Sequence, residues 1–303
     1  MGLEGFNMTV PEDCITEGVG VKHLANKCYK QIRKVKQNLH THTTYCDGKD
    51  TPEEMIQVAL KKGFQSIGFS GHSYMYYSPK WGMSLAGTEQ YKRKITELKQ
   101  KYENEIEIFL GLEVDMFSEV DLSGYDYLIG STHYLSIGDE KVGFDRSAEE
   151  VERVINEYFG GDGMAYAKEY YRTIARLPEY GSFDIIGHFD QITKHCENRQ
   201  FFDENTKEYQ FAVIEAAEAL AGKIPYFEVN TGAIARGYRT TPYPAPFIMK
   251  ELKRLGFGAV LSSDCHNSEF LDCGYDLSAE FLKECGYKEH YVLTKQGFIP
   301  QAL

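Results

Sequence analysis

Nine side chains that can bind metal ions stand at or just beyond the ends of apolar segments in this 303-residue sequence. They are His40, His42, Asp47, His72, Glu113, His133, His188, Asp264 and His266. Imidazole and carboxylate groups are ligands for zinc, iron and manganese. A lone histidine after a strand is more often a hydrogen-bonded core residue. Six together without a metal, however, would leave a crowded, partly cationic pocket. The set therefore predicts a metal cluster.

Two short motifs strengthen this prediction through their spacing. One residue separates His40 from His42, and one residue separates Asp264 from His266. Side chains alternate between the two faces of a strand, so each pair is expected to point to one side. Cys265 would then point the opposite way, and we interpret it as a small apolar residue.

Seven apolar segments of strand length are expected to position these residues. The predicted strands are 36–43, 65–72, 106–114, 125–133, 183–190, 225–232 and 258–266. Helical patterns occur between them at 149–159, 164–177, 211–221 and 246–255. The clearest helix start is Thr51-Pro52-Glu53-Glu54, an N-cap, a first-turn proline and a capping box. Alternating strands and helices predict a parallel sheet, and in a parallel barrel all C-terminal strand ends open at one mouth.

The composition narrows the class of protein. Hydrophobic residues make up 42% of the chain, which is enough for a substantial core. The net charge of −12 disfavours nucleic acid as a partner. Seven cysteines show no pairing framework, and no signal peptide or long apolar segment is present, so we expect a cytoplasmic protein without membrane contact. The composition leaves the oligomeric state open.

The first 35 residues differ from the rest, because they contain a basic run and no clear strand. We interpret residues 1–35 as an N-terminal extension with a solvated helix and residues 36–303 as one domain. The three remaining histidines, His23, His195 and His290, are interpreted as surface or helix residues.

Seven motifs resemble those of the PHP (polymerase and histidinol phosphatase) superfamily, and they occur in the family's order over about residues 36–300. They are NLHTHTTYCDG from 38, GLEVD from 111, GSTHY from 130, FDIIGHFD from 183, FEVNTG from 227, TPYPAP from 241 and LSSDCH from 261. The match extends to the histidinol-phosphate phosphatase branch. This resemblance implies an α/β fold, a distorted (β/α)7 TIM-like barrel with its active site at the C-terminal mouth.

The resemblance also implies three groups of ligands for two or three divalent ions (Zn, Fe or Mn). The first group is His40, His42, Glu113 and Asp264. The second shares Glu113 and adds His133 and His188. The third is Asp47, His72 and His266. Some relatives have histidine where this chain has Asp47, and a carboxylate is an acceptable replacement.

Other residues are predicted to act on the substrate. Arg236 stands where the family places a phosphate-binding arginine, and Arg239 is a rival for that role. Lys194 is a second cationic candidate. Each of these residues is about as readily explained as a solvated surface charge. Asn230 either binds substrate or caps its loop. Asp190 is predicted to be the acid for the leaving group or an orienting residue.

The activity that the resemblance implies is hydrolysis of a small phosphomonoester, L-histidinol phosphate, to L-histidinol and phosphate in histidine biosynthesis. A second hypothesis is a PHP phosphoesterase for another monoester, a nucleotide or an oligonucleotide. A third is a structural or metal-storage module. The nearly complete ligand set argues against this third hypothesis, because metal storage does not require an open site.

Overall fold

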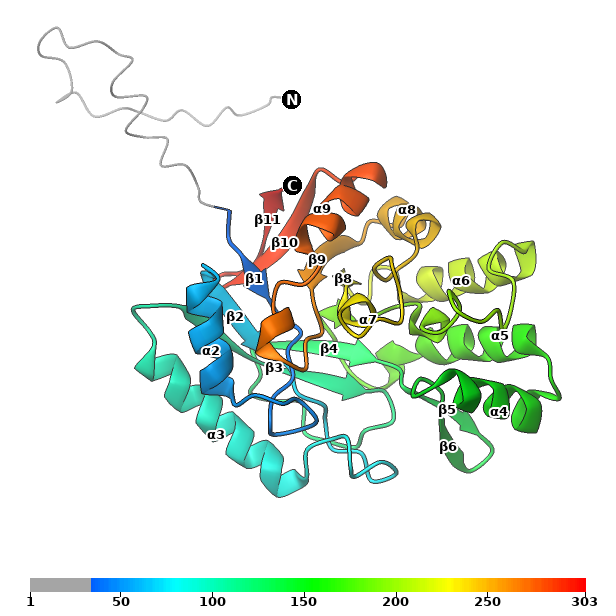
Figure 1. Cartoon of the computed structure of the whole chain (residues 1–303), viewed down its shortest axis with the longest axis horizontal. Helices are drawn as coiled ribbons and strands as arrows, with labels where there is room; N and C mark the ends of the chain where they lie inside the picture. The colour runs from blue at the N-terminus through cyan, green and yellow to red at the C-terminus, as the bar shows by residue number, and fades with distance from the viewer. Residues whose placement is uncertain (1–33) are drawn as a thin grey trace, which may run out of the picture. The chain divides into compact units, whose positions relative to one another are not determined.

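Seven parallel strands form a nearly closed barrel in the computed structural model, which describes residues 34–303 (Figure 1). In spatial order they are β1 (Gln37–Asn38), β2 (Ser66–Phe69), β3 (Glu107–Asp115), β4 (Tyr127–Ser131), β7 (Ile185–Ile186), β8 (Tyr226–Asn230) and β9 (Gly258–Ser262). The two edges meet just beyond β1 and β9, where Thr41 forms a parallel bridge with Cys265. The backbone N–H of His42 donates to the Cys265 carbonyl at 2.9 Å. The predicted distorted barrel of seven strands is confirmed.

Helices follow most of the strands and cover the barrel from outside. The α-helices are α2 (Pro52–Lys61), α3 (Leu85–Lys101), α4 (Ala148–Phe159), α5 (Gly163–Ile174), α6 (Lys207–Leu220), α7 (Gly232–Ala235), α8 (Pro246–Arg254) and α9 (Tyr275–Glu284). Short 3-10 turns occur at Leu177–Glu179, Gln191–Thr193 and Ser268–Phe270. Helix α2 begins as predicted, because Thr51 and Glu54 form a reciprocal capping box. The segments between strands were expected to be helical, but no bounds were predicted for α3 and α7, and α9 was not predicted. Helix α3 is mostly polar and buries only Tyr91, Ile95 and Leu98 fully.

Two antiparallel hairpins were also absent from the prediction. Strands β5 (Tyr134–Ile137) and β6 (Glu140–Gly143) form one, and β10 (Glu289–Thr294) and β11 (Gly297–Ala302) form the other. The second hairpin is joined to β1, because the Gln37 side chain donates to the Leu293 carbonyl at 2.8 Å and accepts from the Leu293 N–H at 2.7 Å.

A small cluster of apolar side chains from several strands is separate from the larger core. It consists of Leu39, Phe109, Tyr127, Ile129, Ile185, Val260 and Leu293. The Tyr127 hydroxyl donates to the Leu39 carbonyl. A Cβ atom at Gly68 or at Gly111 would come within 2.3 Å of the Tyr127 side chain. Glycine at these two strand positions therefore makes room for the tyrosine, which helps to fill the space between the strands.

Three predictions outside the barrel have different outcomes. Residues 1–33, which include His23 and most of the predicted N-terminal extension, lie outside the described part of the chain. The interpretation of His195 and His290 as surface or helix residues is wrong, because they are only 6% and 8% exposed and His290 belongs to β10. Within residues 34–303, no helix combines the length and apolar character needed to cross a membrane.

Candidate metal centre

The strand ends bring all nine predicted ligands to one end of the barrel. His40 and His42 follow β1 and lie beside Asp264, which follows β9. His72, beyond β2, forms a parallel bridge with Glu113 of β3. The remaining four follow these or other strands: Asp47, His133, His188 and His266. Residues far apart in the sequence thus converge because parallel strands end at the same edge.

Four side chains surround a single point. Nε2 of His40 lies 3.3 Å from Oε2 of Glu113 and 3.6 Å from Oδ1 of Asp264. Nε2 of His42 lies 3.5 Å and 3.2 Å from the same two oxygens. A tetrahedral ion with ligands at about 2.0–2.1 Å keeps its ligand atoms about 3.3–3.4 Å apart. These four interatomic distances therefore fit the edges of a zinc-sized coordination sphere.

Three of these four atoms form no hydrogen bond among the described residues, although Oε2 of Glu113 also lies 2.8 Å from Nδ1 of His72. Nε2 of His40, Nε2 of His42 and Oε2 of Glu113 are buried and form no hydrogen bond with the described part of the chain. A buried polar atom left without a partner costs about 1–3 kcal/mol. A cation at the shared point would satisfy all three, so the side chains present fit a metal ion.

The second oxygen of Glu113 faces a different pair of imidazoles. Its Oε1 lies 3.0 Å from Nε2 of His188 and 3.5 Å from Nε2 of His133. On the far side of the His133 ring, Nδ1 lies 3.4 Å from Oδ2 of Asp115. Glu113 thus stands between two groups of imidazoles with one oxygen toward each, as a carboxylate that bridges two ions would.

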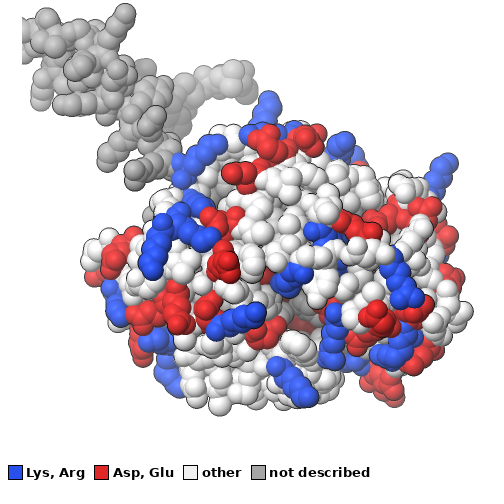
Figure 2. Space-filling view, in the orientation of Figure 1, with Lys and Arg blue, Asp and Glu red and all other residues white. Residues whose placement is uncertain are grey.

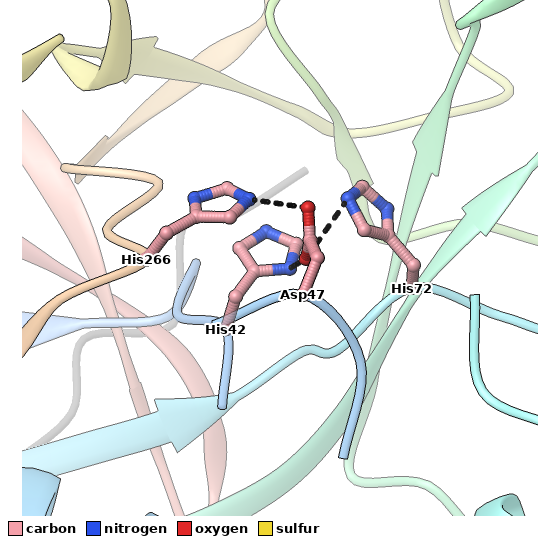
Figure 3. A group of neighbouring side chains, drawn as sticks. All are labelled: His42, Asp47, His72 and His266. Atoms are coloured by element: carbon pink, nitrogen blue, oxygen red, sulfur yellow. Dashed lines mark ion pairs between the residues drawn. The ribbon is translucent and has the colours of Figure 1, made fainter. Parts of the chain in front are cut away.

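A third group surrounds Asp47 (Figure 3). The figure shows the carboxylate between three imidazoles, with an ion-pair contact to each. Oδ2 lies 3.2 Å from His266, and Oδ1 lies 3.6 Å from His42 and 3.7 Å from His72. The rings of His42 and His266 stack with centroids 4.0 Å apart. Because His42 takes part in this group and in the first, the groups are neighbours within one cluster.

The cluster alters the acid–base properties of its members. Burial, together with the nearby His266 and His72, lowers the pKa of His42 to about 3. Burial also opposes protonation of His72, but Glu113 and Asp47 outweigh it and raise the pKa of His72 to about 9. His42 is thus neutral, which is the state that binds metal, and His72 carries a proton that a divalent cation would displace.

A pocket of about 370 Å³ opens beside the cluster. Its wall includes five of the clustered residues: Asp47, His72, His133, Asp264 and His266. The rest of the lining is Met75, Trp81, Tyr134, Asp145, Arg146, Gln191, Lys194, Arg236 and Tyr238. Pockets for small molecules commonly begin at about 300 Å³, so a small substrate fits this volume. Over the face of the molecule shown in Figure 2, acidic and basic side chains are interspersed.

Two of the predicted substrate-binding cations line this pocket. Arg236 donates to Oδ2 of Asp264 at 3.1 Å and lies 3.2 Å from Nδ1 of His266. Lys194 forms an ion pair with Asp145 at 3.1 Å. The rival Arg239 is not part of the pocket lining, because its guanidinium is buried in hydrogen bonds to residues 193 and 241.

Asn230 and Asp190 do not line the pocket. The Asn230 amide donates to Glu228 at 2.7 Å and accepts from the Gly232 N–H at 2.8 Å, which corresponds to the loop-capping alternative. The Asp190 carboxylate is fully buried and accepts from the Ala245 N–H at 2.9 Å. This geometry brings neither side chain to the lining of the pocket, and each of the two instead forms hydrogen bonds that hold a loop.

Three acids near the cluster were missed by the sequence analysis. Asp115 contacts His133, Glu228 contacts His40, and Asp145 lies in the pocket wall. Alternation along a strand could have revealed the first two, because Asp115 is two residues from Glu113 and Glu228 is two residues from Asn230. Asp145 follows the unpredicted β5–β6 hairpin and gave no comparable signal.

The fold and the site together define a class: an α/β barrel whose C-terminal mouth carries clustered imidazoles and carboxylates suited to several metal ions. The family model described as the PHP domain matches residues 38–232. The chain belongs to the PHP domain family.

Known relatives resemble the chain over most of its length. A probable histidinol-phosphatase of Deinococcus radiodurans is 29% identical over 241 residues, which cover 75% of this chain and 85% of the relative. The histidinol-phosphatase of Bacillus subtilis is 27% identical over 275 residues, covering 82% and 99% of the two chains.

A solved structure shows the same fold. It is a histidinol phosphate phosphatase from Lactococcus lactis in complex with zinc, L-histidinol and phosphate. The TM-score is 0.67 at 21% sequence identity, and the match covers 87% of this chain and 98% of the other.

Proposed function

We propose that this protein is a metal-dependent phosphomonoesterase that hydrolyses L-histidinol phosphate to L-histidinol and phosphate, with residues 36–303 as the catalytic domain. One observation carries the proposal that it binds catalytic metals. Buried atoms of His40, His42 and Glu113 that form no hydrogen bond in the described structure surround one point together with Asp264, beside an open pocket. An open position beside the ligands is what distinguishes a catalytic metal site from a closed structural one.

The proposed ligands fall into three groups for two or three ions of zinc, iron or manganese. The first is His40, His42, Glu113 and Asp264; the second is Glu113, His133 and His188; the third is Asp47, His72 and His266. Nitrogen and oxygen donors suit all three metals. Divalent ions there would supply Lewis acidity to a phosphate group and help to generate the nucleophile from water.

Two cations of the chain would hold the outer phosphate oxygens. Arg236 and Lys194 line the pocket, and a guanidinium can form two parallel hydrogen bonds with a phosphate. Arg236 forms an ion pair with Asp264, and Lys194 forms one with Asp145. These ion pairs hold both cations beside the cluster, where a phosphate dianion could replace the carboxylates as their partner.

Asn230 and Asp190 would act through the loops that they anchor. Asn230 holds the turn into α7, the helix that Arg236 directly follows. Asp190 holds Ala245 at the start of α8. We therefore assign both residues positioning roles, and we leave protonation of the departing alcohol to water.

The choice of L-histidinol phosphate as substrate is supported by the relatives and by the size and lining of the pocket. Both curated relatives are described as histidinol-phosphatases, and they cover most of this chain. A pocket of about 370 Å³ suits a small monoester, and Trp81 and Tyr238 offer aromatic faces that could contact an imidazole or an ammonium group.

The experiment compares phosphate release from L-histidinol phosphate, a nucleoside monophosphate and a short 5′-phosphorylated oligonucleotide, each with added manganese or zinc. The proposal expects the highest kcat/KM for L-histidinol phosphate. A higher kcat/KM for either of the other two substrates would overturn the substrate assignment. Loss of activity in His42→Ala with every substrate would support the metal centre, and retained activity would refute it.

A further inference from the structure

Glu228 of β8 lies behind the proposed metal centre, and nothing in the reaction proposed above uses it. Its side chain is 1% exposed. Oε2 accepts hydrogen bonds from Nδ1 of His40 at 2.8 Å and from the Ser262 hydroxyl at 2.5 Å. Oε1 accepts from the backbone N–H of His188 at 2.7 Å and from the Asn230 amide at 2.7 Å.

These four donors come from different parts of the barrel. His40 follows β1, His188 follows β7, Asn230 ends β8 and Ser262 ends β9. An ionised carboxylate only accepts hydrogen bonds, and its two oxygens have room for about four of them. The four donors thus use the acceptor capacity of the ionised Glu228 carboxylate. Two of these donors belong to proposed metal ligands, His40 and His188.

The bond to His40 determines which nitrogen of that ring can bind a cation. Nδ1 must carry the proton to donate to Glu228, so Nε2 keeps its lone pair. Nε2 is the atom that lies 3.3 Å from Oε2 of Glu113 and has no hydrogen-bond partner in the described structure. Carboxylates behind metal-binding histidines commonly fix the tautomer and orientation of the ring in this way.

We propose that Glu228 is a positioning residue, which fixes the tautomer and ring orientation of His40 and anchors the backbone at His188, and thereby sets the affinity of the centre for metal. The inference rests on the metal centre proposed above. Glu228 itself touches neither metal nor substrate.

Replacement by glutamine tests this role because it conserves size and removes two acceptor sites. If the amide nitrogen faces His40, it forces Nδ1 to accept, and the proton then moves to Nε2 and blocks the lone pair. If the amide nitrogen faces His188 instead, its N–H groups point at the backbone N–H of His188, and that backbone group loses its hydrogen-bond acceptor. Either arrangement disturbs one proposed ligand, and loss of such a supporting group typically costs 10–100-fold in metal affinity.

The measurement is zinc affinity and stoichiometry of the full chain, by competition with a chromophoric chelator. We expect Glu228→Gln to bind at least one ion about 10–100-fold more weakly than the unsubstituted protein. Nitrogen NMR of ¹⁵N-histidine-labelled metal-free protein separates the two arrangements: one Nδ1–H imidazole is lost if the amide nitrogen faces His40, and all are kept if it faces His188. Loss of that Nδ1–H signal is a signature that a general loss of stability would not produce.

Two further variants separate positioning from folding. Asp184→Asn is the matched control. Asp184 directly precedes β7, whereas His188 follows that strand, and its carboxylate accepts a hydrogen bond from the backbone N–H of Leu128. This substitution should leave zinc affinity unchanged. Ser262→Ala removes one of the two donors to Oε2 and should weaken zinc binding less than Glu228→Gln does. If Glu228→Gln does not fold, Ser262→Ala decides: unchanged zinc affinity overturns the proposal.

Equal affinity and stoichiometry in Glu228→Gln and in the unsubstituted protein would also overturn the positioning role. An unsubstituted chain that takes up no zinc, iron or manganese would refute this inference and the metal centre together. A chain that binds metal but does not release phosphate from L-histidinol phosphate would refute only the substrate assignment and leave the role of Glu228 open to the affinity measurement.

Discussion

Nε2 of His40 lies 3.3 Å from Oε2 of Glu113, and both atoms are buried without a hydrogen-bond partner in the described structure. Burial alone favours the neutral carboxyl group of Glu113, yet His72, His40 and His133 outweigh it and hold its pKa well below the usual range. Glu113 is therefore ionised and enclosed by imidazoles, which makes it the central residue of the cluster and the first one to test.

Glu113→Gln should lower both metal content and activity. The two oxygens of Glu113 face separate groups of imidazoles, so a neutral amide in its place should weaken the binding of two proposed ions at once. We expect a loss of zinc affinity beyond the 10–100-fold typical of a supporting residue, and a loss of kcat of at least similar size. Metal analysis and phosphate release measure the two effects. Glu107→Gln, at the opposite end of β3, is the matched control, and a similar loss there would point to general damage to the strand.

Arg236→Ala should mainly raise KM. A hydrogen bond to a charged group contributes about 1.5–3 kcal/mol, which corresponds to about 10–150-fold in KM if the guanidinium binds phosphate equally in the ground and transition states. Steady-state phosphate release against substrate concentration measures it. Arg239→Ala is the comparison, because its bonds to Thr193 and Thr241 predict lost stability with KM nearly unchanged. A larger rise in KM for Arg239→Ala would reverse the two assignments.

Removal of metal should abolish activity and lower stability together. An ion that binds the folded chain but not the unfolded chain stabilises the fold by about 2.7 kcal/mol when its free concentration is 100 times the dissociation constant. Thermal unfolding before and after treatment with a chelator should show this as a lower Tm. Adding back zinc or manganese should restore both Tm and phosphate release. Full activity in a chain shown to be free of metal would contradict the proposed function.

Asp272 gives a prediction for the dependence of stability on pH. It pairs with Lys36 and Lys62 at 2.6 Å each. Partial burial raises the pKa of Asp272, but the two lysines outweigh it and lower the pKa below its usual value. Its contribution to stability is therefore complete above the unfolded-state pKa of about 3.9 and is lost as the pH falls through the folded-state pKa.

The corresponding variant is Asp272→Asn. At pH 7 it should reduce the free energy of unfolding by about 1 kcal/mol, since the pair is partly exposed and screened by solvent. As the pH falls through the lowered pKa of Asp272 in the folded protein, the difference from the unsubstituted protein should shrink toward zero. Urea unfolding at several pH values measures both, with Asp139→Asn in the exposed β5–β6 turn as the control. A difference that stayed constant with pH would exclude the ionic explanation.

The sequence was most informative where local patterns decide structure. All seven predicted barrel strands are present, and the capping box at Thr51 and Glu54 begins α2 as expected. Such features depend on neighbouring residues, namely on alternation, β-branched content and caps. No bounds were predicted for helix α3, which is amphipathic but mostly polar, and the two hairpins escaped although each pairs strands that are neighbours in the sequence.

The sequence alone determined which residues could bind metal, since histidines and acids at strand ends are visible without coordinates. Only the tertiary structure decided how they group, with Glu113 facing two sets of imidazoles and Glu228 behind His40. It also placed Arg236 in the pocket lining and Arg239, Asn230 and Asp190 outside it. The physical reason is that distances and directions between side chains on different strands depend on how the barrel closes, and no spacing along the chain encodes that closure.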